Sequence, residues 1–219
     1  MELSIDTASE LASIAVSKQG VVFSQMTWRC QRNHTVELLP SVEKLFAQAG
    51  ASKDDVTAVF VCIGPGMYTG LRVGVTTAKA MAHALGTPIV GVGRLELDAY
   101  PHAAFDGDIV AVHKAGRGDV AWASYRGDPW REITPPTLSK ANDLGSISTR
   151  TIFVGEVDEA LAGILGSLAE AARQDNVGRA TVLAELAYLR LADGDVDDAA
   201  LLAPIYLRPP AIGPQTVAG

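Results

Sequence analysis

Two periods of apolar residues run along this chain, and they predict alternating helices and strands. Residues 35–49 place apolar side chains three or four positions apart, which is typical of an amphipathic helix. A second helical pattern covers residues 70–85, and Gly86 followed by Pro88 is typical of a helix end. Residues 56–63 form a nearly continuous apolar run, which fits a strand covered on both faces. This alternation indicates an α/β protein.

Shorter patterns complete the expected secondary structure. Strands are predicted at residues 2–5, 11–17, 21–28, 89–92 and 151–155, and helices at residues 156–172 and 179–191. Residues 128–150 contain three prolines and are expected to form loops. Residues 205–207 are expected to form the last strand, followed by a frayed tail over residues 208–219.

The second half of the chain repeats the pattern of the first half. The stretches LSIDTASELASIAVSKQG and IVAVHKAGRGDVAWASYRG each contain a short apolar strand, a polar turn, an alternating strand and a basic residue near a glycine. This indicates an internal duplication and two lobes with mixed sheets flanked by helices. We assign an N-terminal lobe to residues 1–100 and a C-terminal lobe to residues 101–219, with a boundary within residues 98–108. Whether the last helix and strand pack back onto the N-terminal lobe is left open.

The loop after the long apolar strand is the first candidate site. Gly64, Gly66 and Gly70 permit close backbone approach, and the following helix offers unpaired N–H groups, so a nucleotide phosphate could bind here. The loop lacks the lysine of a P-loop, and the alternative is a tight joint between strand and helix. Asp6 and Thr7 end the first strand, where actin-like ATPases position a magnesium nucleotide, although an Asp there also commonly caps a turn.

Other classes of chemistry have less support. The four histidines form neither H-x-x-x-H nor H-E-x-x-H, so no helical metal pair exists in the sequence. No G-x-S-x-G nucleophile motif is present. Cys62 lies in a buried strand pattern and is expected to be a core residue.

The net charge of −7 argues against a bare nucleic-acid-binding surface, because phosphate contacts need clusters of Lys and Arg. The chain could still be the acidic member of a complex that contacts RNA through a basic partner. No apolar stretch reaches about 18 residues, and the first residues lack a basic signal-peptide pattern. We therefore expect a cytoplasmic protein that does not enter a membrane.

With these residues in view, the sequence resembles the bacterial TsaB family, also called YeaZ. The matching segments follow the family order and cover most of the chain: IDTASELASIAV, NHTVELLPSVEKLF, GPGMYTGLRVGVTTAKAMAHALGTPIVGV, DGDIVAVHKAGRGDVAWASY and LLAPIYLRPPA. The resemblance implies an actin-like (ASKHA, ribonuclease H-like) two-lobed duplicated fold. It also implies a non-catalytic role beside TsaD, the subunit that transfers the threonylcarbamoyl group to adenosine 37 of tRNA.

The resemblance further implies particular partners. Family members bind a TsaD-type homologue, with a TsaE-type ATPase joining a larger complex, and they form homodimers when alone. Contact with tRNA is expected only indirectly. No cofactor is expected to bind independently. ATP or ADP is expected at the partner interface, with vestigial contacts from Asp6, Thr7, Gly64 and Gly66.

In the family, the helices that match residues 35–49 and 70–85 carry the partner surface. The candidate partner-binding residues are His34, Leu38, Leu45, Leu71, Val75, Ala78 and Met81. The apolar residues of these helices could instead form the core of the lobe, and His34 could cap the first helix. If they form a surface, Ala78→Glu or Met81→Glu should abolish partner binding and leave the monomer folded.

Several positions depart from the family pattern. TsaD-like proteins carry two metal-binding histidines where this chain has Arg94 and Asp98, and an arginine has no lone pair to give a metal. Three further departures remove polar or acidic groups: Thr7-Ala8, Met67-Tyr68 and His113-Lys114-Ala115. We therefore favour a supporting subunit that activates a TsaD-type threonylcarbamoyltransferase. The alternative is an actin-like ATPase or small-molecule kinase that uses Asp6 and the glycine loop.

Overall fold

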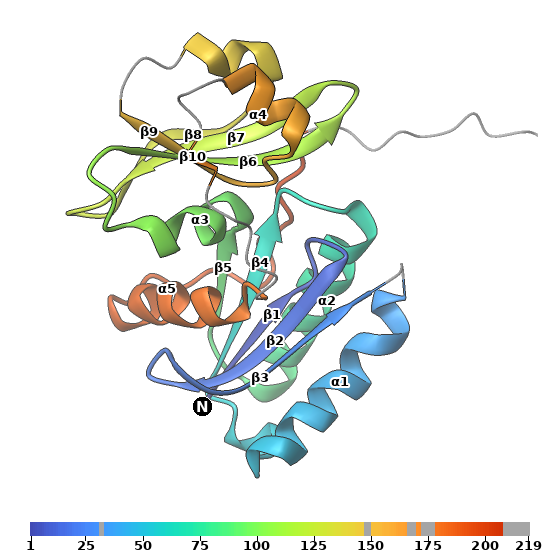
Figure 1. The fold of residues 1–219 in the computed structure, drawn as a ribbon. Coiled ribbons are helices and arrows are strands. Elements are labelled where there is room, and N and C mark those ends of the chain that lie inside the picture. Colours follow the sequence, from blue (N-terminus) through green and yellow to red (C-terminus); the bar gives the residue numbers. More distant parts are fainter. Residues whose placement is uncertain (31–32, 147–149, 166–169, 172–177, 208–219) are drawn as a thin grey trace, which may run out of the picture.

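The fold consists of two lobes, each built on a five-stranded mixed sheet (Figure 1). The computed structural model describes residues 1–30, 33–146, 150–165, 170–171 and 178–207. The N-terminal sheet has the order β3-β2-β1-β4-β5. Its strands are β1 (Glu2–Asp6), β2 (Leu11–Lys18), β3 (Val21–Arg29), β4 (Ala58–Gly64) and β5 (Ile89–Gly93).

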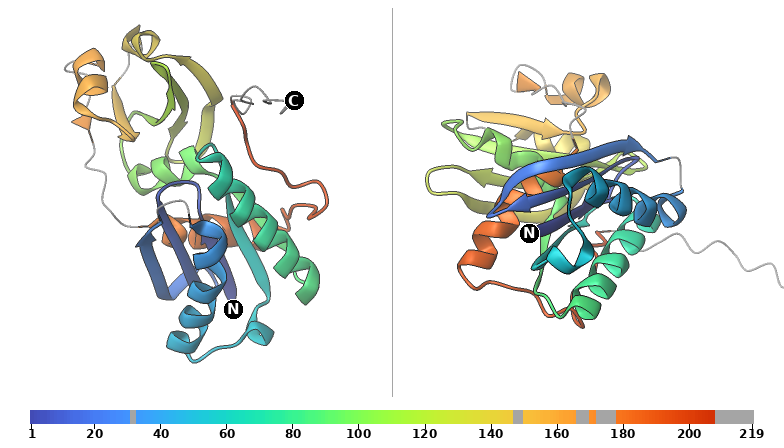
Figure 2. Two further views of the ribbon diagram at one scale, coloured as in Figure 1. Left: turned by 90° about the vertical axis from the view of Figure 1, so that its right-hand side faces the viewer. Right: turned by 90° about the horizontal axis from the view of Figure 1, so that it is seen from below.

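Helices cover both faces of the N-terminal sheet. On one face lie α1 (His34–Ala49) and α2 (Tyr68–Leu85), which run along the same side of the lobe (Figure 2). On the other face lies α5 (Ala180–Ala192), from the far end of the chain. Successive side chains of a strand point to opposite faces, so each strand packs against both helical layers. Val59 and Val61 pack with the α1 and α2 side, whereas Phe60 packs with α5.

The C-terminal sheet has the order β10-β9-β6-β7-β8. Its strands are β6 (Asp108–Gly116), β7 (Asp119–Arg126), β8 (Arg131–Lys140), β9 (Thr151–Gly155) and β10 (Glu170–Ala171). The short helix α3 (Arg94–Ala99) covers one face, and α4 (Glu159–Leu165) covers the other. Three short 3-10 helices complete the described secondary structure: Lys53–Asp55, Tyr100–His102 and Ala141–Ser146.

The two sheets repeat one topology. On one side of β1, β2 and β3 are added by two antiparallel pairings, and on the other side β4 and β5 are added by two parallel pairings. The same arrangement surrounds β6. This repeat confirms the internal duplication that the sequence pattern predicts.

One helix lies between the sheets. In α3, Leu95 and Ala99 pack on the C-terminal sheet, whereas Leu97 packs with α5 and the N-terminal strands. The helix belongs to the predicted N-terminal lobe of residues 1–100, yet it contacts the C-terminal sheet more extensively than the N-terminal sheet. We therefore count α3 and the 3-10 helix Tyr100–His102 with the C-terminal lobe, and their polar side chains lie at the junction of the lobes.

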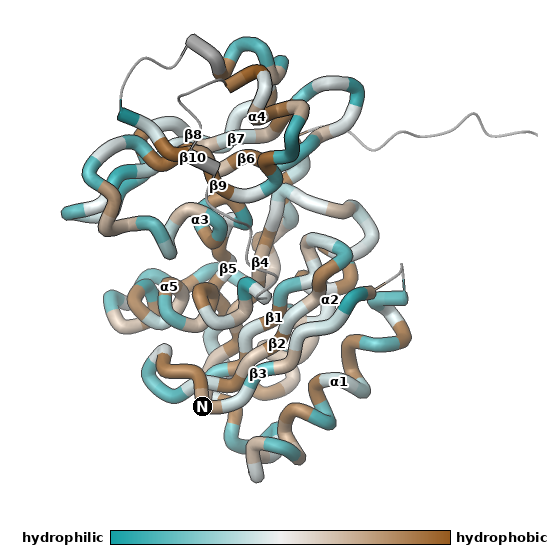
Figure 3. Tube along the Cα trace, viewed as in Figure 1, coloured by the Kyte–Doolittle hydropathy of each residue, from teal (hydrophilic) through white to brown (hydrophobic). Residues whose placement is uncertain are grey.

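Both long N-terminal helices confirm the prediction from the 3.6-residue period. Figure 3 shows hydrophobic and hydrophilic residues alternating along α1. The helix α2 ends where expected, because Gly86 adopts a left-handed φ of 64° and Thr87 N–H donates to the Ala82 carbonyl at 3.0 Å.

Three predicted elements were wrong. Residues 128–150 contain the strand β8, whose Pro135 and Pro136 are tolerated because β8 lies at the edge of its sheet. The helix expected over residues 156–172 is shorter, and Glu170–Ala171 pairs with β9 instead. Residues 205–207 form no strand, although the Ile205 N–H donates to the Ile63 carbonyl at 2.7 Å. The tail expected at 208–219 lies outside the described residues.

Candidate functional site

The glycine loop between β4 and α2 lies directly on the turn between β1 and β2. A Cβ atom on Gly66 would sit 2.2 Å from the Ala8 carbonyl oxygen, and one on Gly70 would sit 2.1 Å from that of Thr7. Met67 N–H donates to the Ala8 carbonyl at 2.8 Å. Only glycine permits this close approach. The loop therefore makes a tight joint within the lobe, and a nucleotide contact at Gly64 or Gly66 stays a prediction.

Asp6 and Thr7 are both buried and engaged in internal bonds. Asp6 Oδ1 accepts the Ala8 N–H at 2.9 Å, which confirms the turn-capping role. Thr7 Oγ1 donates to the Gly70 carbonyl at 2.7 Å, so it fastens the start of α2 to the end of β1. Their role toward a nucleotide is likewise a prediction.

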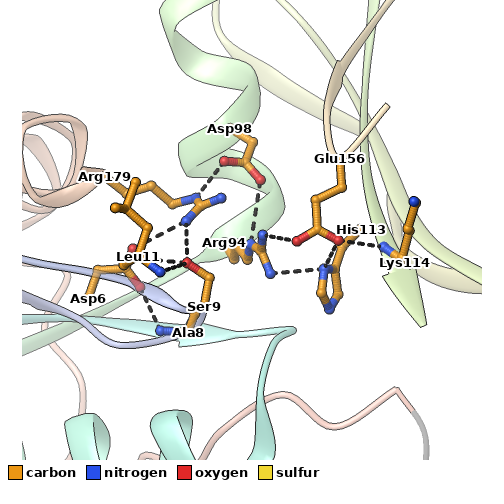
Figure 4. A network of polar contacts seen from close by, with 10 residues as sticks. All are labelled: Asp6, Ala8, Ser9, Leu11, Arg94, Asp98, His113, Lys114, Glu156 and Arg179. Carbon is orange, nitrogen blue, oxygen red and sulfur yellow. Dashed lines mark hydrogen bonds and ion pairs between the residues drawn. The ribbon is translucent and has the colours of Figure 1, made fainter. Parts of the chain in front are cut away.

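Arg179, the residue just before α5, joins the two lobes (Figure 4). Its Nε donates to Asp98 Oδ1 of α3 at 2.5 Å. Its Nη1 lies 3.5 Å from Asp6 Oδ2 and 3.3 Å from Ser9 Oγ. One guanidinium group thus contacts a carboxylate of each lobe.

Arg94, at the start of α3, extends this network into the C-terminal lobe. It is 1% exposed, and its Nη2 donates to Glu156 Oε1 at 2.7 Å. Its Nη1 lies 2.9 Å from His113 Nδ1, and its Nε lies 3.6 Å from Asp98 Oδ2. Glu156 follows β9 and also accepts the Lys114 backbone N–H at 3.0 Å.

His113 Nδ1 has two competing partners at 2.9 Å, Arg94 Nη1 and Glu156 Oε2. A guanidinium only donates and a carboxylate only accepts, so this nitrogen must either accept from Arg94 or donate to Glu156. The network holds three carboxylates and two guanidinium groups.

Two groups of the network, Glu156 and Arg179, hold their charges strongly. Burial acts to raise the pKa of Glu156, but the His113 hydrogen bond and the Arg94 charge outweigh it and keep that pKa well below its usual range. Burial acts to lower the pKa of Arg179, but Asp98 and Asp6 raise it further above its usual value. Glu156 and Arg179 are therefore both charged at neutral pH.

A cleft of about 440 Å³ opens beside the network. The glycine loop and the start of α2 form one wall, the end of β6 forms another, and residues 205–207 close it. Tyr68 and Tyr206 face each other here with ring centroids 5.0 Å apart. Gly66 lines this cleft, whereas Asp6 is fully buried. The cleft is large enough for a small organic ligand.

The structure places the candidate partner residues mostly inside the N-terminal lobe. Six of them are at most 3% exposed in this monomer: His34, Leu38, Leu45, Leu71, Val75 and Ala78. Met81 is half-buried. The expectation that Ala78→Glu leaves the monomer folded is therefore wrong, because the new carboxylate would enter the core.

The outer faces of the same helices carry different residues. Val36 and Leu39 of α1 are 73% and 52% exposed, and Ala80 and Ala84 of α2 are exposed. The helical period identifies the core face but not the apolar residues that lie outside it. Glu156 and Arg179 were also missed, since the sequence signal was only a charge at the end of a predicted element.

A metal cluster and a membrane-spanning helix are both absent from the described residues. Among these residues, no group of three or more His, Cys, Asp or Glu side chains is arranged to hold a metal ion. None of the helices in the described part of the chain combines the length and apolarity needed to cross a membrane.

Comparison with known proteins connects this geometry to a family. The family model described as "TsaD: tRNA N6-adenosine threonylcarbamoyltransferase" matches residues 9–146, more than half of the chain. The protein named "tRNA threonylcarbamoyladenosine biosynthesis protein TsaB" from Bacillus subtilis is 36% identical over 57% of this chain and 54% of its own length. This chain therefore spans about half of that relative. A Mycobacterium tuberculosis protein is 33% identical over 98% of this chain and 95% of its own length.

The fold has a close counterpart among solved structures. The structure titled "YeaZ from Pseudomonas aeruginosa" has a TM-score of 0.78, covers 94% of this chain and 99% of its own, and is 22% identical. This likeness confirms the predicted two-lobed actin-like fold.

Proposed function

The chain belongs to the TsaB (YeaZ) family, and from this premise we propose that it is a supporting subunit in the formation of N6-threonylcarbamoyladenosine at position 37 of tRNAs. In this role it binds a TsaD-type threonylcarbamoyltransferase and holds it in an active state. It carries no catalytic group of its own in this proposal. Contact with tRNA is indirect, through the partner.

The observation that carries this proposal is the pairing of the acids beside the cleft with arginines of the same chain. Asp6 and Asp98 contact Arg179, and Glu156 contacts Arg94. A carboxylate that already has a buried cation gains less from a magnesium nucleotide than a free one does. Arg94 itself has no lone pair for a metal. These pairs support a role that depends on surfaces more than on chemistry in the cleft.

We place the partner surface on the outer faces of α1 and α2, where Val36, Leu39 and Ala80 are exposed. Exposed apolar residues on neighbouring helices fit a protein partner better than water. The same faces serve a homodimer when the partner is absent. A TsaE-type ATPase joins the larger complex, and ATP or ADP is shared at the interface.

The test is titration of the isolated chain with the TsaD-type homologue from the same organism. Leu39→Glu should weaken association at least about 10-fold, because an interface core tolerates a charge poorly. The matched control is Leu189→Glu on α5, since Leu189 is 50% exposed and Leu39 is 52% exposed. If both variants bind like the wild type while remaining folded, the docking surface on α1 and α2 is wrong.

The alternative function is an actin-like ATPase or small-molecule kinase. One observation favours it: the cleft lies beside the glycine loop and the first turn of the 18-residue helix α2. Calorimetric titration with Mg-ATP separates the two functions. Micromolar binding by the isolated chain that Tyr206→Ala abolishes would favour the ATPase, and Asp6→Ala is a less clean variant because Asp6 also contacts Arg179.

A further inference from the structure

We propose that Arg179 is a positioning residue that holds the two lobes in one arrangement, so that the cleft keeps its shape with or without a nucleotide. The lobes of this chain would then act as one rigid body. The inference rests on the contacts between the lobes and does not depend on the identity of the partner.

Arg179 lies between an acid at the end of β1 and an acid on α3. It precedes α5, which packs on the N-terminal sheet, and it contacts Asp6 at the end of β1. Its other contact is Asp98 on α3, the helix between the sheets. The Arg179 side chain is 11% exposed, and those of Asp6 and Asp98 are 0% and 9% exposed. The link between the lobes is therefore almost dry.

The helix α3 is attached to the C-terminal sheet. Arg94 lies one turn before Asp98 on α3 and is held by Glu156 and His113, which come from the ends of β9 and β6. Asp98 is therefore fixed from two sides, by Arg94 and by Arg179. Acids and bases alternate along the path Asp6, Arg179, Asp98, Arg94 and Glu156 (Figure 4).

Opening the cleft would have a cost in free energy. Separation of the lobes would take Arg179 away from Asp98 or from Asp6. Asp6 would then lose its contact with Arg179 in a nearly dry site, or Asp98 would keep only Arg94, 3.6 Å away, and either change is unfavourable. In proteins that close on a ligand, the ligand supplies the contacts that hold the closed state. In this chain the arginine supplies them permanently.

A second polar contact also joins the lobes but has a different character. Tyr100 O–H donates to Glu185 of α5 at 3.2 Å at an exposed position. Water can replace this bond at little cost. Tyr100→Phe is therefore a matched control, since it removes a polar contact between the lobes without leaving a buried charge.

The test measures the distance between spin labels on the two lobes by pulsed electron resonance. The labels are attached to Gln48→Cys on α1 and Asn142→Cys in the C-terminal lobe, both exposed positions. The native Cys30 and Cys62 are 0% and 1% exposed and are shielded from the label. With labelled chains diluted into an excess of unlabelled protein, so that a dimer contains only one labelled chain, the wild type should give one narrow distance that saturating Mg-ATP does not change. Arg179→Met should broaden or shift the distribution, whereas Tyr100→Phe should leave it unchanged.

This readout separates positioning from a purely structural role. A structural ion pair would lower the melting temperature of Arg179→Met and leave the distance unchanged in the folded protein, and that result overturns the proposal. If Arg179→Met does not fold, Asp98→Asn removes one partner at nearly constant shape and should also broaden the distribution. A wild-type distance that moves on addition of Mg-ATP overturns the proposal without any variant.

Discussion

The two lobes share one sheet topology but differ in what covers the sheet. The N-terminal sheet carries helices of 16, 18 and 13 residues, which are amphipathic or largely apolar. The C-terminal sheet carries helices of 6 and 7 residues and supplies Glu156 and His113 to the ionic network. The N-terminal lobe therefore has an apolar helical layer, whereas the C-terminal lobe supplies polar contacts beside the cleft.

The two lobes show that a repeated fold does not imply a repeated role. Fold and function separate because function depends on the side chains placed at a few positions. The N-terminal lobe should be sensitive to charges introduced into its helical layer. The C-terminal lobe should be sensitive to charges removed from its network.

The largest expected effect is on the helical layer of the N-terminal lobe. Ala78→Glu introduces a carboxylate at a position that is 0% exposed, between α2 and the sheet. We expect a loss of about 5 kcal/mol in the free energy of unfolding, or failure to fold, because the charge has no partner there. Denaturant unfolding measures the loss. Ala80→Glu on the exposed face of the same helix is the control and should change stability by less than about 0.5 kcal/mol.

The next effect breaks the network of the C-terminal lobe. Arg94→Met should cost about 3 kcal/mol, because it leaves Glu156 and Asp98 without a buried cation between them. The double variant with Glu156→Gln should recover part of the loss, since it removes one of the unpaired charges. Arg29→Met provides the contrast, because Arg29 and Glu10 are each 64% exposed and such pairs contribute about 0–1 kcal/mol. Equal losses for Arg94→Met and Arg29→Met would contradict a special role for the network.

The smallest effect concerns pH and should distinguish Glu156 from other acids. The pKa of Glu156 lies below its ordinary value of 4.5 in the folded chain, so its stabilisation is fully present above pH 4.5 and is lost as the pH falls below it. The difference in unfolding free energy between the wild type and Glu156→Gln should therefore shrink by about 1–2 kcal/mol between pH 6 and pH 3. A difference that stays constant or grows on acidification would show that the carboxylate is not held in its charged form.

The sequence predicted the N-terminal lobe better than the C-terminal lobe, and the reason is length. The helices α1 and α2 span several turns, so their apolar period is clear. The helix α3 has six residues, too few to show a period, and was missed. The strand β8 was hidden by its prolines, which are allowed because the strand lies at a sheet edge.

The site was predicted only in outline. Asp6 and the glycine loop were recognised because they end strands, which is a local signal. Arg179 was not recognised, because its partners Asp6 and Asp98 are remote in sequence and only the packing of α5 brings them together. The burial of Leu38 and Ala78 likewise depends on which side of each helix meets the sheet. Pairwise tertiary contacts of this kind leave no mark on a single sequence.

The placement of α5 on the N-terminal sheet has a consequence for synthesis of the chain. The face of β4 that carries Phe60 stays open until residues 180–192 have left the ribosome, although the strands themselves are complete by residue 93. This apolar face of the N-terminal sheet therefore stays exposed to solvent while the second half of the chain is translated. A fragment that stops before α5 should bind chaperones, because its apolar sheet face is uncovered. The helix α5 thus completes the N-terminal lobe, although that lobe is made first.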